Sequence, residues 1–309
     1  MKMHDLIIIG AGPAGLSAAI YAARYKLDAV VISRDAGGTA LTAHKVCNFP
    51  TYNDISGREL MDKMLKHSEN LGITIGYDNV TKIEKKKEHF EVHTDGEKEY
   101  HAKTVLFAAG GENRKLNVPG EEKFLGRGVS YCATCDASFY KGKTVAVMGG
   151  GNAALTSALM LTDYAKKVYI IYRGGSFLKA EPAWVDAVDK SKKIEIMLNE
   201  DISEIKGEKA VDCAKLKSGK ELKLDGVFIE IGSVPNTGLL DNLKVALSEG
   251  FIKTDNAQKT NVEGFYAAGD ITTNSNRFQQ IITACAEGAV AVNAIYKELK
   301  GASDSKKDY

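Results

Sequence analysis

The sequence predicts an α/β fold with two Rossmann-like, three-layer dinucleotide-binding domains, each carrying an antiparallel β-meander, the second domain inserted in the first. Two observations predict it. A pattern of strand, glycine turn, helix and strand occurs near the start of the chain and again near its middle. A last apolar strand, residues 264–268 (GFYAA), follows after the second copy has closed and finds no partner there. We therefore expect a discontinuous first domain, residues 1–116 and 245–309, and an inserted second domain, residues 117–244.

Both copies begin with a short apolar run rich in β-branched residues, which is typical of a buried parallel strand. In the first copy the expected strand, helix and strand are residues 5–10 (DLIIIG), 13–25 and 29–33. In the second copy they are residues 143–149 (KTVAVMG), a helix from residue 152, and residues 167–172 (KVYIIY).

Each copy continues into three short strands that predict a meander, with Asp95-Gly96 and Ser218-Gly219 as hairpin turns. The six strands are expected at residues 80–84, 89–94, 99–103, 202–205, 211–217 and 221–224. A further strand closes each copy, residues 104–110 and 226–232. Pro119-Gly120 and Pro235-Asn236 are the expected crossings between the domains, and the polar tail from Gly301 is expected to be irregular.

The composition excludes several classes of protein. With 41 basic and 40 acidic residues, the chain lacks the positive charge of a nucleic-acid-binding protein. Residues 6–23 are uncharged and approach the length of a membrane span, but Gly10, Gly12, Pro13 and Gly15 interrupt them. We therefore expect a soluble, cytoplasmic protein that binds neither nucleic acid nor membrane.

Five cysteines occur, at positions 47, 132, 135, 213 and 285, and only Cys132 and Cys135 are close in sequence. An odd and sparse set is not typical of a secreted disulfide framework. A C-x-x-C pair can open and close as a disulfide without moving the fold. The alternatives are a zinc site, which needs four ligands where no second C-x-x-C occurs, and two buried structural cysteines. No metal is expected.

Two glycine motifs predict two bound nucleotides. Gly10, Gly12, Pro13, Ala14 and Gly15 belong to a G-x-G-x-x-G turn between strand and helix, where backbone N–H groups meet a pyrophosphate. The second turn has the G-x-G-x-x-A form and comprises Gly149, Gly151, Asn152, Ala153 and Ala154. Asp270 follows the strand at residues 264–268, where it can bind a ribityl hydroxyl of a flavin or cap a helix.

Residues 126–136 (GRGVSYCATCD) carry a specific resemblance. With Asn48-Phe49-Pro50, GFYAAGD and residues 278–284 (FQQIITA), they match the low-molecular-weight FAD-dependent thioredoxin reductases in order and spacing over essentially the whole chain. The resemblance implies a homodimer that passes electrons from NADPH through FAD to the Cys132–Cys135 disulfide and on to thioredoxin. It also implies hinges at the two crossings.

The same resemblance assigns site residues. Asp136 is expected as the general acid and base, with a turn cap as its alternative, and Arg127 and Phe139 as thioredoxin contacts. Besides the first glycine turn and Asp270, the expected FAD contacts are Arg34, Gly38, Thr39, Ala40, Asn48, Gly110, Gln279, Gln280 and Ile281. Besides the second turn, the expected NADPH contacts are Arg173 and Lys179.

The chain departs from the family pattern at the pyridine site. NADPH-using members carry His-Arg-Arg where this chain has Tyr172-Arg173-Gly174, and Lys179 is displaced by one position. Thr156 and Ser157 replace acidic residues on the helix after the turn. At the flavin site Thr39-Ala40 replaces Gln-Leu, and Gln279 replaces an arginine. NADPH is the expected electron donor, with ferredoxin or a deazaflavin as the alternatives. Two other functions remain open: the chain could reduce a disulfide protein other than thioredoxin, or it could be a flavin-binding redox sensor without turnover.

Overall fold

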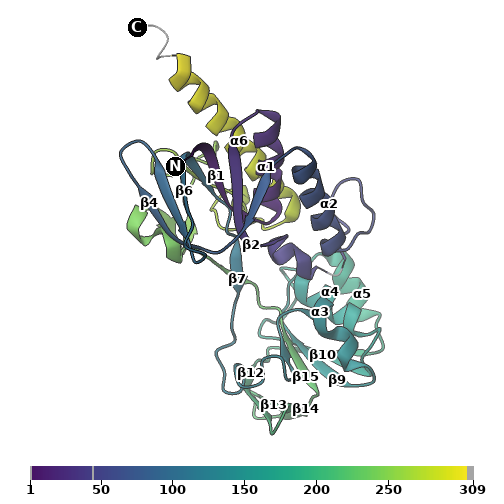
Figure 1. The fold of residues 1–309 in the computed structure, drawn as a ribbon. Coiled ribbons are helices and arrows are strands. Elements are labelled where there is room, and N and C mark those ends of the chain that lie inside the picture. The colour runs from purple at the N-terminus through teal and green to yellow at the C-terminus, as the bar shows by residue number, and fades with distance from the viewer. Residues whose placement is uncertain (1, 44, 305–309) are drawn as a thin grey trace. The chain divides into compact units, whose positions relative to one another are not determined.

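The computed structural model describes residues 2–43 and 45–304, and these divide into two compact units (Figure 1). The first unit comprises Met1–Leu41, Val46–Glu112 and Pro235–Tyr309, and the second comprises Thr42–Lys45 and Asn113–Val234. The chain crosses between them at β7 (Gly111–Asn113) and β16 (Ser233–Pro235), which pair with each other.

The first unit is built on a seven-stranded sheet with helices packed against it. Its strands are β1 (Met3–Ala11), β2 (Ala29–Ala36), β3 (Thr74–Tyr77), β4 (Val80–Lys85), β5 (Phe90–Thr94), β6 (Glu99–Phe107) and β19 (Phe265–Ala267). Its helices are α1 (Pro13–Arg24), η1 (Gly38–Thr42), α2 (Gly57–Asn70), η3 (Gly238–Leu243), η4 (Ser275–Arg277) and α6 (Ile281–Asp304), and β17 (Leu247–Ser248) pairs with β18 (Phe251–Ile252). The last strand, β19, pairs in parallel with β6, so the prediction that it returns to the first sheet is confirmed.

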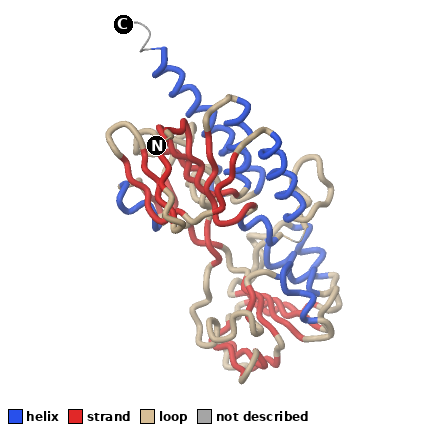
Figure 2. The backbone as a smooth tube through the Cα atoms, viewed as in Figure 1, coloured by secondary structure: helices blue, strands red, loops and turns tan. Residues whose placement is uncertain are grey.

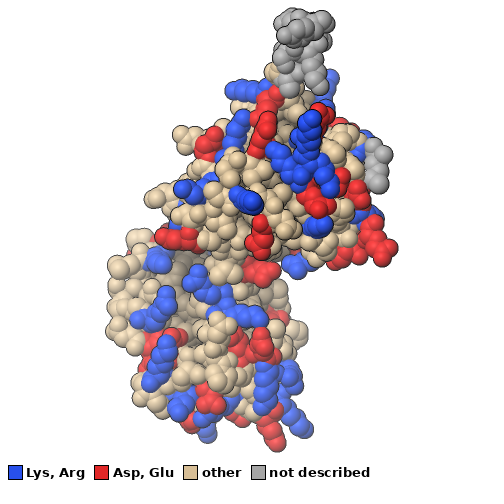
Figure 3. All heavy atoms as spheres, turned by 90° about the vertical axis from the view of Figure 1, so that its left-hand side faces the viewer, with Lys and Arg blue, Asp and Glu red and all other residues tan. Residues whose placement is uncertain are grey.

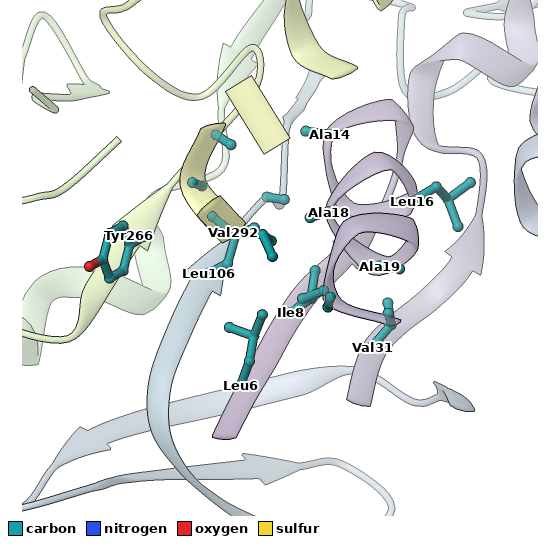
Figure 4. Close-up of a cluster of buried hydrophobic side chains, with 14 of the residues drawn as sticks. Leu6, Ile8, Ala14, Leu16, Ala18, Ala19, Val31, Leu106, Tyr266 and Val292 are labelled. Atoms are coloured by element: carbon teal, nitrogen blue, oxygen red, sulfur yellow. The ribbon is translucent and has the colours of Figure 1, made fainter. Parts of the chain in front are cut away.

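Both faces of β1 are buried because its side chains alternate between two cores. Leu6 and Ile8 pack with α1 and α6, as Figure 4 shows around Ala18 and Val292. Ile7 and Ile9 pack on the opposite face against β4, β5 and η3. The continuous apolar run that predicted a buried parallel strand therefore serves a three-layer unit.

The first meander differs from its prediction in one respect. We expected residues 99–103 and 104–110 as two strands, but β6 is a single strand from Glu99 to Phe107. Its first half pairs antiparallel with β5, and its second half runs parallel to β1 and β19. The meander is therefore an extension of the main sheet, and β6 connects the two parts.

The second unit has the same plan with two separate sheets. Its five-stranded sheet contains β8 (Val129–Ser130), β9 (Thr144–Met148), β10 (Lys167–Tyr172), β11 (Ile194–Leu198) and β15 (Gly226–Ile229). Its meander is β12 (Ile202–Gly207), β13 (Val211–Leu216) and β14 (Glu221–Lys223), and its helices are α3 (Ala133–Asp136), η2 (Ala137–Tyr140), α4 (Asn152–Leu161) and α5 (Pro182–Asp189). Val145 and Val147 face the helices, whereas Ala146 and Met148 face the meander. Figure 2 shows these helices on one side of the strands.

The expected first crossing at Pro119-Gly120 is wrong. The backbone N–H of Ile205 donates to the Pro119 carbonyl oxygen at 2.9 Å, and a Cβ on Gly120 would lie 1.9 Å from the Ile205 carbonyl oxygen. This turn is thus docked on β12 inside the second unit. Residues 235–244 lie with the first unit, because Leu240 and Leu243 of η3 are buried in its core.

The chain's end and its surface complete the description. The expectation of an irregular tail from Gly301 is wrong for residues 301–304, which belong to α6, and residues 305–309 lie outside the described residues. Within the described part of the chain, no helix is long and apolar enough to cross a membrane. Acidic and basic side chains are interspersed over the face in Figure 3.

The contact of α1 with α6 generates a test of the first unit. A Cβ on Gly288 of α6 would lie 2.1 Å from the carbonyl oxygen of Ala14. Gly288→Ala should therefore lower the melting temperature by on the order of 5 °C, since overpacking against backbone costs about 1–3 kcal/mol.

Gly301→Ala in the same helix is the matched control. A Cβ there meets no atom within 4 Å, so it should leave the melting temperature unchanged or raise it slightly through the better helix propensity of alanine. Equal melting temperatures for Gly288→Ala and wild type would contradict the close packing of α1 on α6.

Candidate active site and dinucleotide sites

Cys132 and Cys135 form a disulfide in the second unit, with their Sγ atoms 2.00 Å apart. Cys132 caps the single-turn helix α3, and the backbone N–H of Cys135 lies 3.1 Å from the Cys132 sulfur. Cys135 is exposed and Cys132 is half-buried. The pair therefore closes a small ring within one helical turn, and its bond can be exchanged with an external thiol without unfolding the surrounding strands.

The pair is anchored at the edge of the parallel sheet. The backbone N–H of Cys132 donates to Ser130 Oγ at 3.0 Å, and Ser130 Oγ donates to the Cys132 carbonyl oxygen at 3.2 Å. Ser130 belongs to β8, which runs parallel to β15. Asp136 directly follows Cys135 and ends α3. The pKa of Tyr140 is raised by the burial of its own hydroxyl and by the negative charge of Asp136.

Glu121 is a buried carboxylate beside the redox pair that the sequence analysis missed. It is 2% exposed, and it accepts hydrogen bonds from the backbone N–H groups of Leu116 and Asn117 at 2.8 and 2.6 Å. It also accepts the hydroxyl of Tyr131, whose pKa is raised by burial and by this carboxylate. Glu121 thus fixes the residue before Cys132. Nothing in the sequence separates it from its exposed neighbour Glu122.

The first glycine turn brings backbone against backbone. A Cβ on Gly15 would lie 1.8 Å from the Gly10 carbonyl oxygen, and one on Gly10, whose φ is +104°, would lie 2.4 Å from the Ala108 carbonyl oxygen. Gly12 caps α1 without a side-chain hydrogen bond, so the first N–H groups of the helix are open to an anion. Gly38 lies beside Gly12, since a Cβ on Gly38 would lie 3.3 Å from the Cα of Gly12. These expected flavin contacts are therefore grouped.

Asp270 lies where β19 ends, as expected. Its carboxylate makes no hydrogen bond to the described residues, and burial, reinforced by the charge of Glu287, raises its pKa to about 6. Its carbonyl oxygen accepts a hydrogen bond from Gln279 Nε2 at 3.0 Å. A largely buried carboxylate without a partner favours the binding of a group that donates a hydrogen bond to it, and a ribityl hydroxyl is such a donor.

The remaining expected flavin contacts fall into two groups. Asn48 Nδ2 donates to Gln280 Oε1 at 2.9 Å, so residues distant in sequence meet where α6 begins at Ile281. The exposed Arg34 lies near the end of β2, Thr39 and Ala40 lie in η1, and Gly110 has a φ of +58° after β6.

Glu287 of α6 organises the loop around Asp270 and was also missed by the sequence analysis. It is 6% exposed and accepts hydrogen bonds from Gly269 N, Thr272 Oγ1 and Ser275 Oγ at 2.8, 2.9 and 2.6 Å. A single acidic residue within the otherwise apolar run AEGAVAV was the available signal. Its three hydrogen bonds hold the backbone on both sides of Asp270.

The second glycine turn repeats the close approach. A Cβ on Gly149, whose φ is +141°, would lie 2.1 Å from the Glu230 carbonyl oxygen and 2.9 Å from the Cβ of Ala154. Gly151 caps α4 without a side-chain hydrogen bond. Asn152 Nδ2 donates to Glu181 Oε1 at 2.8 Å, and Asn152 Oδ1 accepts the Glu181 N–H at 2.7 Å. These two hydrogen bonds tie the loop after β10 to the turn. Ala153, the next residue, is exposed on α4.

Two cations lie near this turn. Arg173 and Lys179 are exposed, and neither has an acidic partner within the described residues. Lys179 forms an isolated bridge with Gly151, which places its backbone beside the turn. A side chain at position 174 would meet the ring of Tyr172, because a Cβ on Gly174 would lie 2.6 Å from that ring.

The ring of Tyr172 lies between the turn and the following loop. A Cβ on Gly150 would lie 2.5 Å from the Tyr172 ring, which stacks on Phe177 with ring centroids 5.8 Å apart. The ring therefore accounts for the unusual Gly150 and Gly174 together. The first residue of the family's His-Arg-Arg run is replaced here by an aromatic residue that packs against the turn.

A carboxylate also lies at this turn, though it does not come from the helix. Ser157 Oγ of α4 donates to Glu230 Oε1 at 2.9 Å, and burial raises the pKa of Glu230 to about 7. Glu230 follows β15, where the apolar run VFIEIG contains this one charge. Thr156 and Ser157 replace acidic residues on α4, and folding brings the carboxylate of Glu230 to Ser157, a contact that the sequence did not predict.

Comparison with known proteins identifies the family. The model of the pyridine nucleotide-disulphide oxidoreductase family matches residues 4–288. The chain belongs to that family. Accordingly it is an oxidoreductase that acts on a disulfide, and it carries a C-x-x-C disulfide between Cys132 and Cys135.

Named relatives of this oxidoreductase are similar over nearly their whole length. The thioredoxin reductase of Listeria monocytogenes is 41% identical over 297 residues, which cover 94% of this chain and 92% of the relative. The crystal structure of Lactococcus lactis thioredoxin reductase is 35% identical, with a TM-score of 0.91, over 95% of this chain and 98% of that one. A ferredoxin-flavin thioredoxin reductase from Clostridium acetobutylicum is 36% identical, with a TM-score of 0.54, over 97% of this chain and 99% of that one.

Glu230 generates a test by pH. Between pH 4.5, the ordinary pKa of a glutamic acid, and about 7, the folded protein keeps a proton that the unfolded chain has released. Stability contributed by this group is therefore lost as the pH rises through that window, by up to about 3 kcal/mol. Glu230→Gln should remove that loss, so its melting temperature should exceed that of wild type at pH 8 and approach it at pH 5.

Glu263→Gln is the control for this comparison, because the Glu263 side chain is 95% exposed. Its melting temperature should differ from that of wild type by the same small amount at both pH values. The same pH dependence in Glu230→Gln as in wild type would show that Glu230 does not titrate in this range.

Proposed function

We propose that this oxidoreductase is a thioredoxin reductase, which takes electrons from NADPH and passes them through FAD to the Cys132–Cys135 disulfide and then to the disulfide of thioredoxin. The observation that carries the proposal is a C-x-x-C disulfide on a one-turn helix, with Cys135 exposed, in a chain that has two glycine turns of the dinucleotide-binding kind. The relatives named thioredoxin reductase, similar over more than nine-tenths of the chain, support it.

The residues of the first unit fit FAD. The open N-terminus of α1 at Gly12 suits the pyrophosphate, and the unpartnered carboxylate of Asp270 suits a ribityl hydroxyl. Glu287 holds the Asp270 loop in place through Gly269, Thr272 and Ser275. Bound FAD supplies the relay between a two-electron hydride donor and the disulfide.

The residues of the second unit fit NADPH. The open N-terminus of α4 at Gly151 suits the pyrophosphate, and Arg173 with Lys179 offers positive charge for the 2′-phosphate. No aspartate or glutamate occupies the end of β10, where an NADH-binding site would hold a 2′-hydroxyl. The charge pattern thus favours NADPH over NADH.

The chemistry of the redox pair balances with two electrons and two protons. Reduction breaks the Cys132–Cys135 bond and leaves two thiols, one of which ionises and attacks the disulfide of thioredoxin. The resulting mixed disulfide is broken by the second thiol, which restores the Cys132–Cys135 bond and releases reduced thioredoxin. Asp136, next to Cys135, is the group that we assign to proton transfer.

Two exposed residues near the pair are assigned to thioredoxin docking. Phe139 on η2 is 71% exposed, and exposed aromatic residues are typical anchors of protein interfaces. Arg127 is held by a hydrogen bond to the Lys123 carbonyl oxygen in the loop before β8. A homodimer located in the cytoplasm completes the proposal.

A second candidate differs only in the electron donor. Tyr172 occupies the space in which a second arginine would stand, so the 2′-phosphate site has fewer cations than the family pattern. The similarity to a ferredoxin-flavin thioredoxin reductase makes ferredoxin the alternative donor.

Steady-state assay of thioredoxin reduction tests the assigned pair. Cys132→Ser and Cys135→Ser should each lower the turnover number by on the order of 1,000-fold or more, because each variant removes one of the two thiols that act as a unit. Reduction of the bound flavin by the donor should persist in both variants.

Cys47→Ser is the matched control, because Cys47 is an exposed free thiol outside the pair. It should keep wild-type turnover. Full activity in either pair variant would refute the assignment, and a wild-type protein whose flavin is reduced but which turns over no disulfide substrate would be a redox sensor.

A further inference from the structure

The outer face of the first meander gathers histidines and glutamates from two antiparallel strands. On β5, alternate residues Glu91 and His93 point away from the core, with His89 just before the strand. The register pairs Glu91 directly with His101 of β6 and pairs His93 with Glu99. Because side chains alternate with a period of two, these residues share one face.

Three of these side chains converge. His89, Glu91 and His101 each offer one ligand atom, and these atoms lie within 4.8 Å of one another. The rings of His89 and His101 stack with centroids 5.2 Å apart and an interplanar angle of 12°. His89 just before β5, Glu91 on β5 and His101 on the paired strand β6 thus form a triangle of ligand atoms on this face of the sheet.

The donor set has the chemistry of a zinc site. Two imidazole nitrogens and a carboxylate oxygen are the ligands of known three-residue Zn²⁺ sites that keep a fourth position for water. Tetrahedral coordination at about 2.0–2.1 Å places ligand atoms about 3.4 Å apart, so closing the triangle needs shifts of roughly 1 Å at side-chain ends. His89 Nε2 already lies 3.4 Å from Glu91 Oε1.

The surrounding groups support the same arrangement. His101 Nε2 lies 2.6 Å from Glu99 Oε1, and metal-binding histidines commonly donate their other ring N–H to such a carboxylate. Lys86 Nζ lies 3.0 Å from Glu91 Oε2, which holds that oxygen and leaves Oε1 on the side of His89.

We propose that His89, Glu91 and His101 form a Zn²⁺ site, separate from the redox pair and from both glycine turns. The ion would link β5 to β6 across the hairpin at Asp95-Gly96. β6 continues from His101 to Phe107, next to Ala108, whose carbonyl oxygen contacts Gly10. Bound zinc therefore stabilises the strand on which the first glycine turn rests.

A neighbouring set defines the sharpest control. Glu84, Glu91 and His93 also offer ligand atoms within 4.8 Å, and His93 Nε2 is buried without a hydrogen-bond partner among the described residues. This set has one imidazole and two carboxylates, a harder donor set that suits Zn²⁺ less well than two imidazoles do. His93 is therefore assigned no role in zinc binding.

Isothermal titration of ZnCl₂ into the tag-free, flavin-loaded protein with its disulfide closed tests the proposal. Wild type should take up one Zn²⁺ per chain in a saturable step, and ZnCl₂ should raise its melting temperature. His89→Asn and His101→Asn should each lose both effects while keeping the metal-free melting temperature of wild type. His93→Asn and His67→Asn, the latter on exposed α2 surface, should keep both effects.

Three outcomes would overturn the assignment: no saturable uptake by wild type, unchanged uptake in both His89→Asn and His101→Asn, or loss of uptake in His93→Asn alone. None of these outcomes bears on thioredoxin reduction, which the cysteine variants test separately.

Discussion

At each of the two glycine turns, one stretch of backbone lies directly against another. The oxygen of Gly10 occupies the space of a Cβ on Gly15, and the oxygen of Glu230 occupies that of a Cβ on Gly149. A helix can therefore begin against the carboxyl edge of its sheet, with its first N–H groups pointing outward. The positions of Asp270 in one unit and of Arg173 and Lys179 in the other have meaning for a nucleotide only because these turns fix where a pyrophosphate can lie.

Buried carboxylates hold the loops that surround the functional residues. Glu287 and Glu121 each accept three hydrogen bonds, and backbone N–H groups are among the donors in both cases. Such bonds compensate the cost of burying a charge. Glu230 receives a single bond from Ser157, and its raised pKa reflects that weaker compensation. The first two carboxylates thus hold their loops in place, and Glu230 ties α4 to the end of β15.

Local patterns predicted most of the fold. Apolar runs located β1, β9 and β10 to within two residues, and the leftover strand β19 revealed the insertion. Features that depend on long-range packing could not be read from the sequence. The turn at Pro119-Gly120 has the composition of a linker, and only its docking on Ile205 shows that it is part of the second unit.

The candidate site divides in the same way. The glycine turns, the cysteine pair and Asp270 have fixed spacings and were predictable, whereas Glu121, Glu230 and Glu287 owe their roles to partners brought by folding. The His89, Glu91 and His101 cluster was hidden for a similar reason, because the sheet register decides that His101 faces Glu91. Gly174 was noted as a departure from the family pattern, but the ring of Tyr172 that lies beside it is visible only in the structure.

Whether electrons enter from NADPH can be measured by anaerobic titration of the flavin-loaded protein with NADPH, following the flavin absorbance band. If NADPH is the donor, NADPH should bleach the flavin band rapidly and NADH more weakly, and Arg173→Ala should clearly lose the NADPH response. Absence of bleaching by either nucleotide, in protein that still reduces thioredoxin after chemical reduction of its flavin, would exclude NADPH as the donor and favour ferredoxin.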